Sequence, residues 1–459
     1  MALQDNKRTN FGSRLGAILA AAGSAVGLGN IWRFPCETGA NGGAAFLIVY
    51  IVCILLIAVP VLIAEIGAGR AGRANAFDTY RKLADSSSAG FVGKAIWNTA
   101  GAMCVIAGFL VFAYYSVVAG WTLYYTAIAA TGEISHGGGA AFGMFISDPV
   151  KPTLSLIAFI VITTGIVLLG VQKGIERGSK IMMPMLFILL IVLAICSMSL
   201  PNASKGLEFL FKPDFSKVTT EVWLSAMGQA FFTLSIGIGT LMTYASYFSE
   251  KVNIVKDSFH VVTIDTCVAI LAGLVIFPAA LSVGVSPDTG PTLVFITLPK
   301  IFQMAFGDIP LLQYTVTLLF YILLVMAALT SSISMLEITT VFVSERFKLK
   351  RKTAALILAV LTAFAAFCCS MSFGNWSDVK LFGMNIFDLF DFAVAKFAMP
   401  LGGIFLCFLM KRMGQEKVVA MLTNSGSLRL GKFPVLFYRL ITTLIPALIF
   451  VIFINELFR

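Results

Sequence analysis

The chain has 459 residues, of which 58% are hydrophobic and only 12% are charged. A water-soluble domain carries about twice that charged fraction, so the composition excludes a soluble protein and indicates one that crosses a membrane many times. The formal net charge of +10 does not indicate nucleic acid, because the basic residues lie in short loops between apolar runs, where they determine membrane topology.

Cysteine, histidine and motif content exclude several other classes. The eight cysteines lie in or beside apolar runs with no Cys-x-x-Cys pair, which is typical of small buried side chains. Two histidines, at positions 136 and 260, are too few and too far apart for a histidine metal site. We find no HExxH or GxSxG motif and no filter-like repeated loop, so we expect neither an enzyme nor an ion channel.

Apolar runs are long enough to cross roughly 30 Å of hydrocarbon at eleven places. The first begins after Lys7, Arg8 and Arg14, a start that also resembles a cleaved signal peptide. We interpret it as a membrane segment because the apolar run continues to Pro35. The predicted segments cover residues 15–35, 44–66, 95–129, 153–171, 181–200, 222–248, 258–284, 311–343, 353–373, 386–410 and 433–455.

The basic residues predict an orientation for these segments. With the N-terminus in the cytoplasm, 24 Lys and Arg lie on the cytoplasmic side and 7 on the other, while Arg33 and Lys396 lie within segments. Positive charge favours the cytoplasmic face, so we expect the N-terminus inside a plasma (inner) membrane. Eleven crossings then place the C-terminus outside.

The first segment contains residues that would interrupt a helix. In AGSAVGLGNIWRFP (22–35), Gly23, Gly27 and Gly29 tolerate conformations that other residues resist, and Asn30 can bond backbone groups that leave the helix. Close packing of helices through Gly23 and Gly27, which have Gly-x-x-x-Gly spacing, is the alternative. Unwound backbone at this depth is tolerated only where protein or a water-filled cavity surrounds it.

The sixth segment has the same kind of interruption. Its sequence AFFTLSIGIGTLMTYASY (230–247) places Gly237 and Gly239 after small and hydroxyl residues. Interrupted helices at corresponding positions of two halves predict an inverted-repeat secondary transporter. We therefore expect an all-α polytopic membrane protein with a 5+5 repeat in one transport domain, 1–459. The halves would be roughly 11–200 and 220–410, with an extra helix at 433–455.

Two further segments carry polar groups at mid-depth. MAALTSSISMLE (326–337) holds Thr330, Ser331 and Ser332. Such hydroxyls often bond back to the preceding helical turn, but hydroxyl and carbonyl oxygens also suit a monovalent cation. The seventh segment holds Asp265 in VVTIDTCVAIL, and an intramembrane carboxylate is a functional candidate.

These motifs resemble those of the neurotransmitter:sodium symporters, in their bacterial amino-acid branch. The resemblance rests on SAVGLGNIWRFP, FAYYSVVAGWTL, GQAFFTLSIGIG, YASY and LTSSIS, spread over residues 24–335. It implies two sodium sites. The first would use Ala25, Asn30, Thr233 and Asp265. The second would use carbonyls of Gly23, Val26 and Ala327 and the hydroxyls of Thr330 and Ser331.

The same resemblance implies a substrate site and two gates. Tyr115, or its neighbour Tyr114, would bond the substrate carboxylate together with backbone groups of Gly27 and Gly29. Phe232 would be the lid of the outer gate. The remaining pocket residues would be Ala25, Val111, Thr233, Ser235, Ile238, Ser331 and Met335. The outer gate would pair Arg33 with Asp391, and the inner gate would use Arg8, Tyr247 and Glu345.

Departures from the family pattern sharpen the functional hypothesis. Asp265 replaces the usual asparagine and Ala269 follows one turn later, so we expect no chloride requirement. Gly27 stands where monoamine carriers have an aspartate, which favours a substrate with its own carboxylate. We expect sodium-coupled import of a neutral, hydrophobic L-amino acid, or alternatively another small carboxylate-bearing solute, with no protein or nucleic-acid partner. Glu337 has no assigned role. Gly174 and Pro184, with nine residues between them, resemble a spacing in family members that suggests unwinding at the cytoplasmic end of the fifth segment, and a static kink at Pro184 is the alternative.

Overall fold

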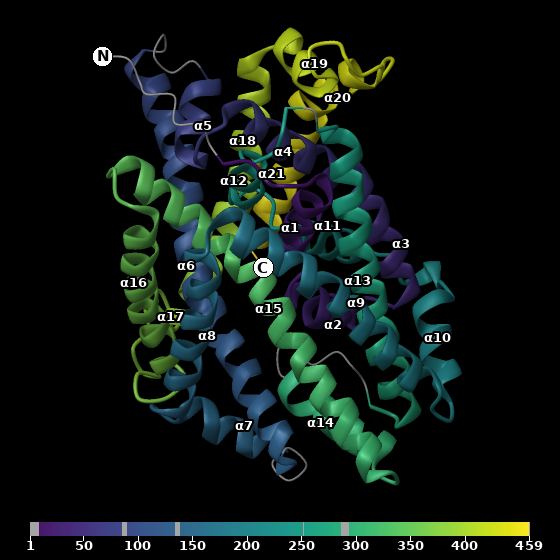
Figure 1. Ribbon diagram of the computed structural model, residues 1–459. Coiled ribbons are helices and arrows are strands. Elements are labelled where there is room, and N and C mark those ends of the chain that lie inside the picture. The colour runs from purple at the N-terminus through teal and green to yellow at the C-terminus, as the bar shows by residue number, and fades with distance from the viewer. Residues whose placement is uncertain (1–8, 85–89, 134–137, 251, 286–292, 459) are drawn as a thin grey trace.

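The computed structural model describes residues 9–84, 90–133, 138–250, 252–285 and 293–458. Helices joined by short loops account for these residues, and no strand occurs among them apart from one isolated bridge between Leu381 and Met384. The predicted all-α membrane fold is confirmed. Its helices lie roughly alongside one another in a bundle (Figure 1).

Within the described residues, nine helices are long and apolar enough to cross a membrane. Each coincides with one predicted segment, because long apolar runs without water must satisfy their backbone groups internally. They are α3–η2–α4 (Ala44–Gly72), α6 (Phe91–Thr131), α8 (Lys151–Leu168), η4–α9 (Val171–Met198), α13 (Ile254–Ser282), α15 (Pro310–Arg346), α16 (Arg351–Met371), α17–η7–α18 (Ile386–Met413) and α20–α21 (Phe433–Asn455).

The first and sixth predicted segments are interrupted helices. The first is α1 (Arg14–Ala25) followed by the π-helix η1 (Gly29–Arg33) and α2 (Phe34–Ala40), bent by 55° at the break. The sixth is divided into α11 (Thr220–Thr233) and α12 (Thr240–Ala245). Neither α11 nor α12 is long enough to span a bilayer alone, and together they occupy the sixth predicted segment.

Shorter helices lie at the two ends of the bundle (Figure 1). We name these ends for the orientation that the basic residues predict. The inner end carries α5 (Ala76–Leu83) and α19 (Gln415–Thr423). The outer end carries α7 (Gly138–Ser147), α10 (Ala203–Phe211) and α14 (Leu298–Phe306).

The core lies along α15 and the interrupted helices. In α15, 78% of the most apolar 18-residue stretch is buried, against 28% in the last span. α1 packs against α9, α13 and α15. Peripheral helices instead expose apolar side chains, such as Val360 and Phe364 on α16, as expected for surfaces that face lipid tails as apolar as leucine.

Candidate ion and substrate sites

The break in the first span frees backbone oxygens at the centre of the bundle. α1 ends at Ala25, and Val26 is extended, with φ −68° and ψ 118°. The Val26 N–H still bonds the Ala22 carbonyl, at 2.7 Å. In a continuous helix the Gly27 N–H would bond the Gly23 carbonyl, but here it bonds a side chain instead. The break is held by Asn30, whose Oδ1 accepts from the Gly27 N–H at 3.0 Å.

The break between α11 and α12 requires left-handed backbone. Ser235, Gly237 and Gly239 have φ of 50°, 89° and 77°. Two of the three are glycines, which adopt such angles at little cost. The buried Glu65 of α4 accepts from the Gly237 N–H at 3.0 Å and from the Met242 N–H at 3.4 Å. It thereby satisfies donors left free near the start of α12. Our sequence reading missed Glu65, although a carboxylate inside an apolar run was the available signal.

Asn30, Thr233 and Asp265 come together from three elements. Asn30 Nδ2 donates to Thr233 Oγ1 at 2.9 Å and to Asp265 Oδ1 at 2.8 Å. The Thr233 hydroxyl lies 3.2 Å from Asp265 Oδ2. All three side chains are buried. Burying a carboxylate is costly unless it is paired or coordinates a metal ion, and no basic side chain contacts Asp265 among the described residues. A monovalent cation would supply the missing positive charge.

A second oxygen cluster joins α1 to α15. The Val26 carbonyl accepts from Ser331 Oγ at 2.8 Å and lies 3.3 Å from Thr330 Oγ1. Thr330 also donates to the Ala327 carbonyl, at 2.9 Å. A β-carbon at Gly23 would lie 3.3 Å from Thr330 Cβ, so glycine permits the close approach. Thr330 therefore makes the bond within its own helix that is usual for threonine, whereas Ser331 reaches across to the broken helix.

The candidate substrate site lies between these two clusters. The Tyr115 hydroxyl accepts from the Leu28 N–H at 3.4 Å. A β-carbon at Gly27 would lie 2.5 Å from Ser331 Oγ and 3.2 Å from that hydroxyl, so a larger residue would fill this space. Tyr114 faces elsewhere, with its ring edge-on to Phe387 at 5.5 Å.

The other predicted pocket residues differ in how deeply they are buried. Val111, Ile238 and Met335 are almost completely buried, while Phe232 and Ser235 are partly buried. A β-carbon at Gly29 would lie 2.9 Å from the Phe232 ring, so that ring covers the broken helix.

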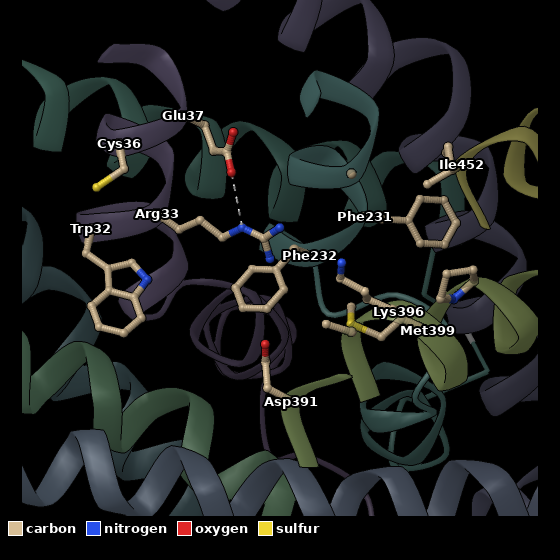
Figure 2. Close-up of a pocket in the computed structure, with 13 residues that line it drawn as sticks. Trp32, Arg33, Cys36, Glu37, Phe231, Phe232, Asp391, Lys396, Met399 and Ile452 are labelled. Atoms are coloured by element: carbon tan, nitrogen blue, oxygen red, sulfur yellow. Dashed lines mark ion pairs between the residues drawn. The ribbon is translucent and has the colours of Figure 1, made fainter. Parts of the chain in front are cut away.

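A cavity of about 290 Å³ lies on the outer side of Phe232. We call it the outer cavity. Arg33 lies over the Phe232 ring, 4.2 Å from its centre, and its Nε is 3.9 Å from Glu37 Oε1. Asp391 lines the same cavity (Figure 2) but forms no ion pair with Arg33 among the described residues. The two residues expected to form the outer gate thus face one cavity without joining in this conformation.

At the inner end, two of the expected gate residues contact other side chains among the described residues. Tyr247 donates to Glu337 Oε1 at 2.7 Å, and Arg351 donates to both oxygens of Glu337 at 2.5 Å. Glu345 accepts from Asn75 Nδ2 at 2.7 Å. Arg8 lies outside the described residues. Glu337, for which the sequence suggested no role, is the acceptor of this network beside an inner cavity of about 380 Å³.

A second inner contact holds the start of α1. The Glu176 carboxylate accepts from the Gly12 N–H at 2.6 Å, from Ser13 Oγ at 2.9 Å and from Lys180 Nζ at 2.7 Å. Glu176 ends the π-helix η4 (Val171–Glu176), which also contains Gly174. The segment that we expect to unwind is therefore helical in this conformation, and Glu176 connects it to the start of α1.

Comparison with known proteins identifies the family of this chain. The model of the sodium:neurotransmitter symporter family matches residues 8–139 and 140–459. The chain belongs to this family. It is therefore a multi-pass membrane transporter and not an enzyme, and sodium-dependent transport is the property that its relatives share.

Its relatives cover the full length. The uncharacterized sodium-dependent transporter YhdH of Bacillus subtilis (strain 168) is 38% identical over 99% of this chain and 98% of its own. An uncharacterized sodium-dependent transporter of Haemophilus influenzae is 31% identical over the whole of both chains. The crystal structure of MhsT in complex with L-phenylalanine superposes with a TM-score of 0.86 at 40% identity, covering 98% of this chain and 100% of MhsT.

Proposed function

We propose that the protein is a sodium-coupled symporter that imports a neutral, hydrophobic L-amino acid by alternating access. The observation that carries this proposal is the position of Gly27, beside the hydroxyls of Tyr115 and Ser331 and with no side chain of its own. The N-terminal end of the helix that resumes after the break and a tyrosine hydroxyl suit a carboxylate. A substrate that brings a carboxylate supplies the anion that this point lacks.

The apolar lining supports a hydrophobic side chain on the substrate. Val111, Ile238 and Met335, which we expect to line the site, are buried, and a charged substrate group would lose its water there without a partner. Met335 is deformable and can adapt to differently shaped side chains. That MhsT was crystallised with L-phenylalanine supports the same substrate class here. Another small carboxylate-bearing solute remains the second candidate, favoured by the same Gly27 geometry.

Two clusters of oxygen atoms support coupling to two sodium ions as co-transported cargo. One is Asn30, Thr233 and Asp265, and the other joins Val26 to Thr330 and Ser331. A tenfold sodium gradient supplies about 1.4 kcal/mol per ion, and a potential of 100 mV adds about 2.3 kcal/mol per ion. Two ions would supply roughly 7 kcal/mol, enough for about a 10⁵-fold accumulation of a zwitterion.

The Asp265 carboxylate supports independence from chloride. It places a fixed negative charge next to Asn30 and Thr233, where a bound anion would otherwise be needed to balance sodium. We expect uptake to continue at an unchanged rate when gluconate replaces chloride. Uptake that stops in gluconate would contradict this part of the proposal. Asp265→Asn should lower transport or make it depend on chloride.

The substrate is tested by binding and then by uptake. Thermal unfolding of the purified protein is followed with each of the twenty amino acids, in sodium and in potassium. We expect aromatic and aliphatic L-amino acids to raise the melting temperature in sodium only, and charged ones to leave it unchanged. Uptake of the best ligand into proteoliposomes should require an inward sodium gradient. A shift with other small carboxylates and with no amino acid would favour the second candidate.

The second sodium cluster is tested with Thr330→Val together with Ser331→Ala. The exposed Thr315 of the same helix makes a comparable bond to the carbonyl four residues earlier, so Thr315→Val is the matched control. We expect the double variant to fold but to lose sodium-driven uptake, because two hydroxyl ligands are removed. Unchanged dependence on sodium concentration would exclude these residues from the site.

The proposed orientation places the N-terminus in the cytoplasm and the C-terminus outside, in the plasma (inner) membrane. The support is the distribution of Lys and Arg, 24 against 7, across loops that the helices separate. Tags at either terminus, digested in intact cells by an added protease, test it. We expect only the C-terminal tag to be removed, and loss of the N-terminal tag would reverse the orientation.

A further inference from the structure

Glu37 is an acidic residue of the outer cavity to which the site described above assigns no role. It lies on α2, one helical turn after Arg33. Its Oε2 accepts from Ser225 Oγ of α11 at 2.6 Å, and Asn41 Nδ2 lies 3.3 Å from that same serine oxygen. Asn41 also donates to the Glu37 carbonyl, at 2.8 Å. The carboxylate is thus fixed by a neighbouring helix, which leaves Oε1 directed at Arg33.

Two carboxylates compete for one guanidinium in this cavity. Figure 2 shows Glu37 and Asp391 on opposite sides of the stacked Arg33 and Phe232 side chains. Arg33 Nε is 3.9 Å from Glu37, whereas Asp391 lies beside the Tyr114 hydroxyl. Because Arg33 stacks on the Phe232 ring between the two carboxylates, movement of the guanidinium toward Asp391 lengthens its contact with Glu37.

We propose that Glu37 is a positioning residue of the outer gate, which holds Arg33 away from Asp391 and so keeps the outer cavity open. This proposal rests on the proposed function, because it assumes that pairing of Arg33 with Asp391 closes the gate. Both Arg33 and Glu37 are partly exposed, at 29% and 24%. Ion pairs of this kind contribute little individually, so exchanging one carboxylate for the other is nearly neutral. Removing one carboxylate is then enough to shift the populations several-fold.

The chain contains a reporter for the state of the cavity. Cys36 precedes Glu37 and lines the same cavity (Figure 2). A membrane-impermeant thiol reagent reaches it at a rate that follows the open population. Subtracting the rate measured for Cys36→Ala removes labelling of the other seven cysteines. The full-length protein in proteoliposomes is used, in sodium and without amino acid.

Glu37→Gln tests the charge while retaining the hydrogen bond to Ser225. We expect it to slow labelling of Cys36 about fivefold, because Arg33 then pairs with Asp391 and closes the cavity. The direct effect has the opposite sign, since the thiolate is the reactive species and losing a neighbouring negative charge favours it. A slower rate therefore reports closure. Glu221→Gln, an exposed change on α11, is the matched control and should label at the wild-type rate.

The double variant Glu37→Gln with Asp391→Asn provides the decisive comparison. Without either carboxylate Arg33 has no partner on the closing side, so labelling should return to within about twofold of wild type. A wild-type or faster rate in Glu37→Gln alone would overturn the proposal, as would slow labelling in the double variant. Labelling needs no substrate, so its outcome is separate from that of the amino-acid panel, which tests the proposed function.

Discussion

The outer and inner ends of the transport pathway are held in their present arrangement by contacts of very different strength. At the outer end, Arg33 and Glu37 are 3.9 Å apart and both partly exposed. At the inner end, Arg351, whose side chain is 27% exposed, makes two hydrogen bonds of 2.5 Å to Glu337, which is fully buried. A partly exposed ion pair contributes about 0–1 kcal/mol, whereas breaking a buried one by removing a partner costs about 3–5 kcal/mol.

The N-terminal segment adds to the inner closure. Phe11 packs edge-on against the rings of Tyr244, Tyr247 and Phe248, and its N–H donates to the Tyr247 carbonyl at 3.0 Å. Glu176 binds the next two residues of the chain. The difference teaches that small changes of side-chain pairing are enough to open or close the outer end. The inner end opens only when several buried polar contacts are hydrated together.

The largest effect is expected from Glu337→Ala, which breaks the strongest inner contact. Arg351 and the Tyr247 hydroxyl would lose their shared acceptor, so we expect the free energy of unfolding to fall by about 3–5 kcal/mol. Unfolding in detergent measures it, with the exposed Glu416→Ala of α19 as control. A loss below 1 kcal/mol would contradict the comparison. Replacing Glu337 and Arg351 together by leucine should recover most of the stability, because no unpaired charge then remains.

A smaller effect is expected where Glu176 holds α1. A β-carbon at Gly16 would overlap the Glu176 carboxylate, so Gly16→Ala should displace it from Gly12 and Ser13. We expect a cost of about 1–3 kcal/mol, because the buried Glu176 carboxylate loses two of its three donors, and faster hydrogen exchange over residues 9–16. Gly165→Ala on α8, where nothing lies within 4 Å of the added carbon, is the control. Equal exchange in both variants would show that Glu176 does not hold this segment.

Pro184→Ala should strengthen the inner end. The proline lies inside α9 and leaves the carbonyl near Lys180 without its helical donor. Restoring that hydrogen bond contributes about 1 kcal/mol, so we expect inward opening and turnover to slow roughly fivefold, with substrate affinity little changed. Normal turnover, together with hydrogen exchange across residues 174–184 of the wild type that does not respond to removing sodium, would exclude unwinding of this helix end.

Arg33→Lys should give the smallest effect, at the weaker outer end. Lysine keeps the charge but loses the planar group that stacks on Phe232, 4.2 Å from the ring centre. A cation–π contact contributes about 0.5–1 kcal/mol at exposed sites, so bound amino acid should dissociate about two- to fivefold faster. Lys396→Arg, in the same cavity, keeps its charge and should leave the rate unchanged. If bound amino acid dissociates from Arg33→Lys at the wild-type rate, stacking of Arg33 on Phe232 does not contribute to the gate.

The sequence by itself determined the membrane crossings and their two interruptions. These are local properties: an apolar run must form a helix in hydrocarbon, and glycine-rich stretches release it. Resemblance, rather than local chemistry, suggested that Asn30, Thr233 and Asp265 belong together, and the structure brings them within hydrogen-bonding distance. The short amphipathic helices at the bundle ends, such as α5 and α19, were not predicted, because long apolar runs indicate only the helices that cross the membrane.

Only the tertiary structure decided which partner each buried charge takes. Sequence patterns did not predict that Glu65 accepts a hydrogen bond from the backbone N–H of Gly237, 172 positions away. Arg351 finds Glu337 across a turn, and Arg33 faces Glu37 and not Asp391. The hydropathy of a segment depends only on the residues within that segment. The choice between two carboxylates depends on differences of a few ångströms between packed helices, and the strength of an ion pair depends on the burial that this packing creates.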